Sequence, residues 1–130
     1  MIQEDYVSFE LAKKLKEKGF PQEMNNSFQY CYNKANEKIL YSPAFLPMKR
    51  NIVEFIFCPT LSLVQKWLRK EKGIHVCPVY ITYNKKEAYE IEINEETILF
   101  EDCPGYCYPV HYKSYEEALA AGINKALEYI

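Results

Sequence analysis

The strongest constraint on the fold lies near the C-terminus, where a helix start signal precedes a helical repeat that contains glycine. Ser114 and Glu117 form a capping box, in which the serine accepts from the Glu117 amide and the glutamate reaches back to the serine amide. Ala118, Gly122 and Ala126 then fall on one line of the helix. Glycine inside a helix costs up to about 1 kcal/mol relative to alanine. We therefore expect this line to pack closely against its support.

Two earlier segments carry the same kind of signals. Ser8 precedes the amphipathic segment 9–18, whose last turn is rich in lysine and which ends at Gly19. The segment 61–72 has an apolar stripe and ends at Gly73. Three helices are therefore predicted, counting the one near the C-terminus.

Runs of aromatic and branched residues predict the strands. They lie at residues 28–32, 39–41, 52–57, 74–83, 88–93, 98–100 and 106–112. The first two runs predict a hairpin. In the run at 88–93, alternation places Tyr89, Ile91 and Ile93 on one face and acidic residues on the other face, toward water. Short joints around the central helix predict a parallel pair with a right-handed crossover. Pro78 moves the second strand of that pair to an edge or a bulge.

The chain has 130 residues, of which 48% are hydrophobic and 26% charged, as is typical of a compact domain. A chain of this length can bury a core without disulfides or a metal. We therefore expect one α+β domain over residues 1–130, with three helices packed on one mainly antiparallel sheet. The crossover would add one parallel pair to that sheet, and residues 43–51, with their prolines, belong to an irregular loop.

The cysteines and the first residues bear on the compartment. The chain has five cysteines, an odd number that argues against a closed disulfide framework. Residues 1–5 are acidic and polar, unlike the start of a signal peptide, and no apolar run is long enough to cross a membrane. We expect a cytoplasmic protein whose cysteines are thiols, with no membrane partner.

The charge balance argues against nucleic acid as the ligand. The net charge is −2, made of +4 over residues 1–72 and −6 over residues 73–130. Proteins that bind phosphate backbones need a basic excess. If the chain bound nucleic acid, its candidate contacts would be the basic side chains on the helices, namely Lys13, Lys14, Lys66, Arg69 and Lys70.

A second class of function, a metal protein or a cysteine-dependent enzyme, rests on soft ligands in the C-terminal half. The candidate residues are Cys103, Cys107, His111, His75 and Cys77. Their spacing argues against zinc, because structural zinc sites commonly have two residues between cysteines and here three intervene. Along a strand His75 and Cys77 share a face about 6 to 7 Å apart, too far for direct proton transfer. We therefore expect no catalytic residue, no metal and no cofactor.

The chain has twelve tyrosines, and their aromatic side chains are its most conspicuous candidates for binding contacts. A sheet face that carries aromatic side chains can anchor a protein interface or stack unpaired bases. Because the tyrosine-rich half is acidic, a protein partner is favoured over RNA. The alternative is that the rings fill half-buried sheet positions and keep their hydroxyls in water. The candidate interaction residues are Tyr80, Tyr89, Tyr106, Tyr108 and Trp67.

Three stretches resemble a known family when taken together. They are residues 59–69 followed by Gly73 to Val76, the ending from Tyr115 to Leu127, and the opening from Ser8 to Gly19. In these the chain resembles a family of short uncharacterised proteins of Bacteroides-type gut bacteria and their phages and mobile elements. The resemblance implies an accessory role in a phage or mobile element, and it carries over no activity, cofactor or binding residue.

The sequence thus favours a non-enzymatic accessory protein that interacts with an unidentified protein partner. A small metal-binding or cysteine-dependent enzyme is the first alternative, and stoichiometric metal in protein purified without added zinc would support it. A nucleic-acid-binding accessory protein is the second, and it predicts retention on a polyanion column that falls steeply with salt.

Overall fold

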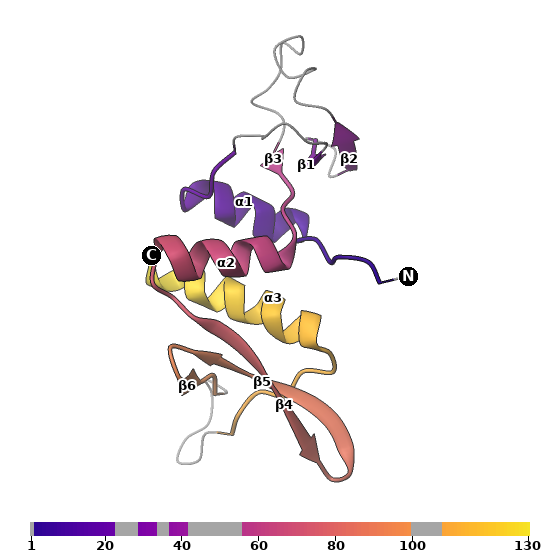
Figure 1. Cartoon of the computed structure of the whole chain (residues 1–130), viewed down its shortest axis with the longest axis vertical. Coiled ribbons are helices and arrows are strands. Elements are labelled where there is room, and N and C mark those ends of the chain that lie inside the picture. Colours follow the sequence, from indigo (N-terminus) through magenta and orange to yellow (C-terminus); the bar gives the residue numbers. More distant parts are fainter. Residues whose placement is uncertain (1, 23–28, 34–36, 42–55, 100–107) are drawn as a thin grey trace. The chain divides into compact units, whose positions relative to one another are not determined.

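The computed structural model describes residues 2–22, 29–33, 37–41, 56–99 and 108–130. They form two compact units, residues 1–60 and residues 61–130, here called the N-terminal unit and the C-terminal unit. Figure 1 labels their helices and strands. The class is α+β, as predicted, with three α-helices in the described residues. The single domain over residues 1–130 stays a prediction.

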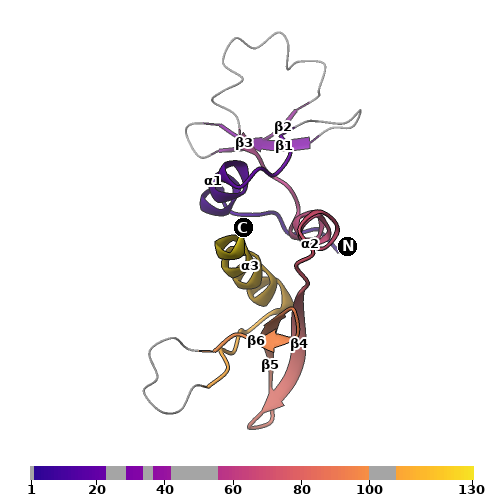
Figure 2. The ribbon, with the colours of Figure 1, turned by 90° about the vertical axis from the view of Figure 1, so that its left-hand side faces the viewer.

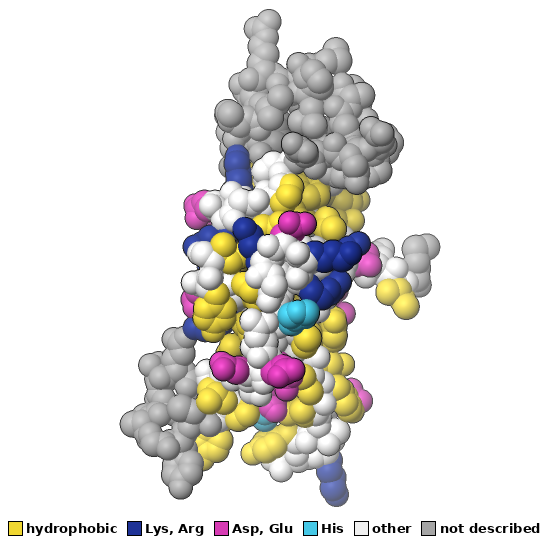
Figure 3. Space-filling view, turned by 60° about the vertical axis from the view of Figure 1, so that its left-hand side comes forward, with side chains coloured by type: hydrophobic (Ala, Val, Ile, Leu, Met, Phe, Trp, Pro, Cys, Tyr) yellow, Lys and Arg dark blue, Asp and Glu magenta, His cyan; other side chains and the backbone are white. Residues whose placement is uncertain are grey.

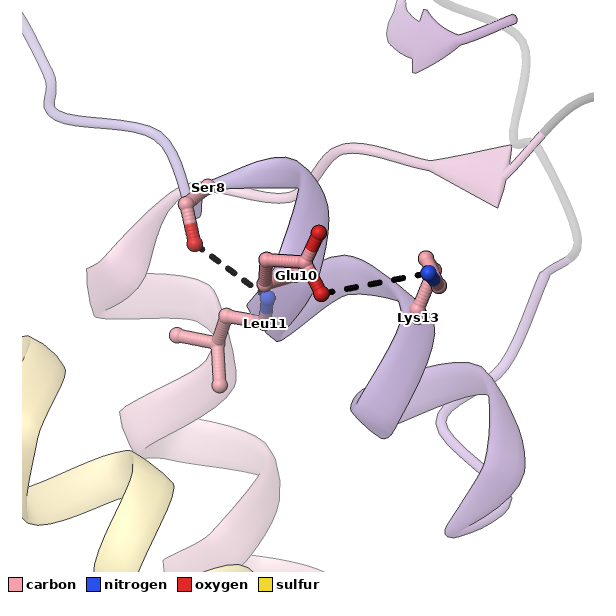
Figure 4. A network of polar contacts seen from close by, with 4 residues as sticks. All are labelled: Ser8, Glu10, Leu11 and Lys13. Atoms are coloured by element: carbon pink, nitrogen blue, oxygen red, sulfur yellow. Dashed lines mark hydrogen bonds and ion pairs between the residues drawn. The ribbon is translucent and has the colours of Figure 1, made fainter. Parts of the chain in front are cut away.

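The N-terminal unit begins with helix α1, Phe9–Glu17, which forms as its end signals predict. The Ser8 hydroxyl accepts a hydrogen bond from the Leu11 amide at 3.2 Å, and Glu10 lies 3.8 Å from the ammonium of Lys13 (Figure 4). Gly19 has a φ of 91°, so the chain turns back after the helix and the Phe20 amide donates to the Leu15 carbonyl at 2.8 Å.

Three short strands complete the N-terminal unit. They are β1, Gln29–Tyr32, β2, Lys38–Tyr41, and β3, Ile56–Phe57. β1 pairs antiparallel with both neighbours in the order β2-β1-β3, so the predicted hairpin is confirmed. Aromatic and aliphatic side chains share the core of this unit, where Phe20 stacks on Phe57 at 6.0 Å between centroids and Leu15 is buried.

The C-terminal unit consists of two helices and an antiparallel sheet. Its elements are α2, Leu61–Glu71, β4, Val76–Tyr83, β5, Lys86–Ile93, β6, Glu96–Thr97, and α3, Tyr115–Ala126, which continues into a 3-10 helix, Leu127–Tyr129. Figures 1 and 2 show α3 lying along one face of the β4–β5 hairpin. Isolated bridges from Tyr89 to Tyr112 and from Leu99 to Pro109 continue the antiparallel pairing, as the sequence predicted for these segments.

Close packing of α3 explains its glycine. A Cβ atom at Gly122 would lie 2.5 Å from Cγ1 of Ile91 and 2.6 Å from Cγ1 of Val76, distances that real Cβ atoms do not tolerate. The predicted close approach is therefore confirmed. At the start of the helix, the Glu117 amide donates to the Ser114 hydroxyl at 3.1 Å as expected. The Glu117 carboxylate accepts instead from the amide of Lys113 at 3.2 Å, one residue further back than predicted.

Pro78 sits in an edge strand, as predicted, and the structure shows why it is tolerated there. The Gln65 side chain donates to the Val76 carbonyl at 2.7 Å, so this carbonyl faces away from β5. Backbone groups two residues apart point to the same side of a strand. The nitrogen of Pro78 therefore also faces the outer edge, where a missing N–H removes no bond of the sheet.

The predicted single sheet and its parallel crossover are wrong. The strands form two three-stranded sheets, and β3 and β4, the proposed parallel pair, belong to different ones. All pairings among the described strands are antiparallel. The physical reason is local: Asn84 and Lys85 have φ angles of 50° and 62°, as a two-residue hairpin turn requires. A neighbour reached through two residues costs less closure entropy than one reached across a helix.

Several predictions fall on residues outside those described. They concern the loop at 43–51, most of the strand at 52–57, and the segment from Phe100 to Cys107. Of the five cysteines, the structure describes Cys31, Cys58 and Cys77, which are free thiols, whereas Cys103 and Cys107 lie outside the described residues.

Candidate functional site

Three tyrosines from three elements form a row of ring contacts on the face of the sheet that α3 covers. Tyr80 of β4 stands directly opposite Tyr89 of β5, and their rings meet edge to face at 5.7 Å between centroids. The Tyr89 ring meets that of Tyr115, the first residue of α3, in the same way at 6.0 Å. We call Tyr80, Tyr89 and Tyr115 the tyrosine row.

The two outer rings of the tyrosine row face solvent. Tyr80 is 53% exposed and Tyr115 40%, whereas Tyr89 is half-buried between them. The Tyr80 hydroxyl lies 3.4 Å from a carboxylate oxygen of Glu87, to which it donates. Partial desolvation and this neighbouring carboxylate raise the pKa of Tyr80, so its hydroxyl stays a neutral donor at physiological pH. The row offers apolar ring area with polar tips, the combination that protein interfaces favour.

The opposite face of the same hairpin carries a groove of about 520 Å³, here called the outer groove. Its walls are mainly aromatic and apolar, and it contains one carboxylate and one imidazole. The lining residues are Ile81, Thr82, Tyr83, Glu90, Tyr108, Pro109 and His111. The His111 ring packs against that of Tyr83 at 5.3 Å between centroids, and Tyr83 and Tyr108 are 59% and 63% exposed.

Glu90 departs from the prediction that the acidic residues of β5 simply face water. It is half-buried, and its Oε2 atom is shielded from solvent without a hydrogen-bond partner. A carboxylate oxygen without water or a donor is energetically costly. In contrast, the predicted alternation itself is confirmed, since Ile91 and Ile93 are buried beneath α3 on the other face.

The histidines and cysteines proposed as metal ligands separate in space. His75 and Cys77 line a pocket of about 400 Å³ with Glu92, Asn94 and Glu95, whereas His111 lines the outer groove. The Asn94 side chain accepts from the His75 amide at 2.8 Å and thereby holds the start of β4. Cys103 and Cys107 lie outside the described residues.

No group of three histidine, cysteine or acidic side chains is arranged to hold a metal ion in the part of the chain that the structure describes. The metal-binding or cysteine-dependent enzyme stays an alternative prediction.

The other candidates are also dispersed. Trp67 lies on α2 and is half-buried, with the Lys72 ammonium 5.5 Å from its ring centroid, so it is not part of the tyrosine row. Tyr108 belongs to the outer groove, and Tyr106 lies outside the described residues. The basic candidates for nucleic-acid binding are exposed on helices of both units: Lys13 and Lys14 on α1, and Lys66, Arg69 and Lys70 on α2.

Sequence reasoning missed Tyr115, Tyr83 and Glu90 as site residues. The alternation of β5 predicts only that Glu90 faces water, and Tyr115 lies inside the capping box between Ser114 and Glu117. The sequence does contain a feature that predicts the contact between Tyr80 and Tyr89. A two-residue turn at Asn84 and Lys85 fixes the hairpin register in which these two residues stand opposite each other. No feature of the neighbouring sequence predicts that the Glu90 carboxylate is shielded from solvent.

No family model matches the chain, and neither a curated protein nor a solved structure shows significant similarity to it. The resemblance to proteins of Bacteroides-type bacteria and their mobile elements therefore stays a prediction. Among the described residues, the helices lack the length and apolar character of a membrane span.

Proposed function

We propose that the protein binds another protein through the tyrosine row, as a non-enzymatic accessory protein. The observation that carries the proposal is the exposure of Tyr80 and Tyr115 at the two ends of a preformed set of ring contacts. Aromatic anchors that are already held in place lose little entropy on binding, and tyrosine is among the residues that contribute most to interfaces.

Packing within the C-terminal unit also supports the proposal. The described buried side chains of this unit are aliphatic, so its core does not require the exposed tyrosine rings. Tyr89 fixes the row, because its amide donates to the Tyr112 carbonyl at 2.9 Å and its carbonyl accepts from the Tyr112 amide at 2.8 Å. The rings of Tyr80 and Tyr115 therefore contact a ring that is held in place, and both remain exposed to solvent.

Charge and redox state favour a protein partner in the cytoplasm. Residues 73–130, which contain the row, carry four basic and ten acidic side chains, a balance unsuited to phosphate backbones. The three described cysteines are free thiols, which suits a reducing compartment. The resemblance to phage and mobile-element proteins supports an accessory role in that setting.

The test compares partner capture by matched variants. Wild-type protein, the double variant Tyr80→Ser with Tyr115→Ser, and a control Tyr129→Ser are each immobilised, and proteins retained from host lysate are identified by mass spectrometry. Tyr129 is 60% exposed and lies at the other end of α3, so it controls for loss of an exposed ring. A protein retained by the wild type and the control but lost by the double variant supports the proposal.

The affinity of that protein is then measured with purified components. Loss of an interface anchor costs about 2 kcal/mol or more, so we expect Kd to rise about thirtyfold or more for the double variant. The Tyr129→Ser control should stay within about twofold. Equal retention by all three chains, with circular dichroism showing that each is folded, would contradict binding through the row.

A further inference from the structure

We infer that the outer groove is a binding site for an arginine side chain of a protein segment. It lies on the opposite face of the hairpin from the tyrosine row, so the inference does not depend on the proposed function. Three observations lead to it: an unpartnered carboxylate oxygen, exposed aromatic walls, and a volume of about 520 Å³ within the range of ligand sites.

The carboxylate sets the charge of the ligand. Oε2 of Glu90 is shielded from solvent and accepts no hydrogen bond, so this carboxylate has lost part of its hydration without gaining a donor. An approaching cation compensates for the lost hydration. The described residues that line the groove include no lysine or arginine, and Lys86 and Lys113 line an adjacent pocket that shares Tyr83 and His111 with it. We therefore expect the ligand to supply the positive charge.

The walls select guanidinium over ammonium. Tyr83 and Tyr108 each expose more than half of their surface, and the His111 ring packs against Tyr83. A planar guanidinium stacks on aromatic faces and donates to a carboxylate in a fixed fork, whereas an ammonium is more strongly hydrated and lacks the plane. Ile81 and Pro109 add apolar surface for the methylene stem of an arginine.

The surroundings of the groove favour a basic segment over a free amino acid. On the face shown in Figure 3, acidic side chains have hydrophobic side chains next to them, and lysine and arginine side chains lie elsewhere on the same face. Glu92 stands two residues from Glu90 on the same strand face, opposite Cys77. Because Glu92 places a second carboxylate on the same strand face as Glu90, an arginine within a basic peptide gains a charge contact that free arginine does not.

The experiment uses three blocked tripeptides as probes: acetyl-Gly-Arg-Gly-amide, its citrulline counterpart, which is neutral and almost the same shape, and its lysine counterpart. Binding to the full-length protein is followed by amide chemical shifts in NMR titrations. We expect saturable shifts around Ile81, Glu90 and His111 with the arginine probe, about tenfold weaker binding of the lysine probe, and no saturation with citrulline. Free arginine should bind more weakly than the tripeptide.

Two variants localise the site. Glu90→Gln should weaken the arginine probe about tenfold to a hundredfold, as expected for loss of a charge-assisted hydrogen bond. Glu116→Gln is the matched control, since Glu116 is an exposed carboxylate on α3 that does not line the outer groove, and it should change the affinity by no more than about twofold.

If Glu90→Gln does not fold, the inference is tested by comparing the binding of the arginine and citrulline probes to the wild-type protein. Equal binding of arginine and citrulline, equal binding of arginine and lysine, or full retention by Glu90→Gln would each overturn the inference. Failure of the tyrosine-row variants to lose a partner would leave these titrations unchanged, so the two proposals fail separately.

Discussion

Aromatic residues are used in opposite ways by the two units. In the N-terminal unit the rings pack inward: Phe20 stacks on Phe57, and Phe9 meets Tyr32 edge to face at 5.5 Å. The Tyr32 hydroxyl donates to the Val7 carbonyl at 2.6 Å, and burial together with a hydrogen bond to Cys58 raises the pKa of Tyr32 to about 12. In the C-terminal unit the described buried side chains are aliphatic, and Tyr80, Tyr83 and Tyr108 are more than half exposed.

The difference teaches that tyrosine content alone does not indicate an interface. A sheet that packs on a helix through small residues has no room for rings beneath it, because the backbones approach too closely. Gly122 of α3 lies against Ile91 and Val76, and the rings of Tyr80 and Tyr115 are left at the margin of this contact. In the N-terminal unit, two cation–π contacts of Lys38, at 4.4 Å from Tyr6 and 5.2 Å from Tyr30, show rings already engaged.

The largest expected effect is on the free energy of unfolding of Gly122→Val. This substitution adds a branched side chain where α3 and the sheet approach too closely to admit an aromatic ring. The added Cβ alone would stand 2.5 Å from Ile91, so we expect a loss of about 3 kcal/mol or more in the free energy of unfolding. Urea denaturation followed by circular dichroism measures it.

The control for this substitution is Ala121→Val, at a half-buried position one residue earlier. It introduces the same β-branched side chain and should cost about 1 kcal/mol or less. Equal losses for the two variants would show that α3 and the sheet are not in close contact at Gly122.

Thiol reactivity should separate the units next. Cys31 and Cys58 of the N-terminal unit are 2% and 1% exposed, and burial raises the pKa of the Cys58 thiol, whereas Cys77 is exposed on the C-terminal unit. Because the thiolate is the reactive species and must be accessible, iodoacetamide should modify Cys77 about a hundredfold faster than either. Peptide mapping by mass spectrometry gives the rates.

In a denaturant the three thiols should react at similar rates, which provides the reference for this measurement. Rapid modification of Cys58 in the folded protein would mean that the N-terminal unit does not protect its interior.

The smallest effect concerns single hydroxyl groups. Tyr32→Phe removes a donor from the Val7 carbonyl and should lower the free energy of unfolding by about 1 kcal/mol. Tyr80→Phe removes a hydroxyl that lies 3.4 Å from Glu87 on the surface and should change it by less than about 0.5 kcal/mol. Urea midpoints at matched slopes measure both. A larger loss for Tyr80→Phe would reverse the contrast between the units.

Much of the local structure was predictable, because short-range contacts decide it. The Ser8 and Ser114 caps and the ends of α1 and α2 at Gly19 and Gly73 follow from neighbouring residues. The small residues of α3 also predict its close packing, although the residues that Gly122 meets, Ile91 and Val76, lie far from it along the chain. The candidate site was predicted only in part. Tyr80 and Tyr89 do meet, but Trp67 lies on α2 and Tyr108 lines the other face of the hairpin.

The amino-acid sequence by itself determined where helices begin and end, which face of β5 is apolar, and that β4 is an edge strand. Each of these depends on residues within about one turn or one strand of each other. The tertiary structure decided that the strands divide between two sheets, that Tyr115 completes a row begun on β4, and that Glu90 loses water. These outcomes depend on which distant segments meet, and that choice reflects the balance of closure entropy and packing over the whole chain.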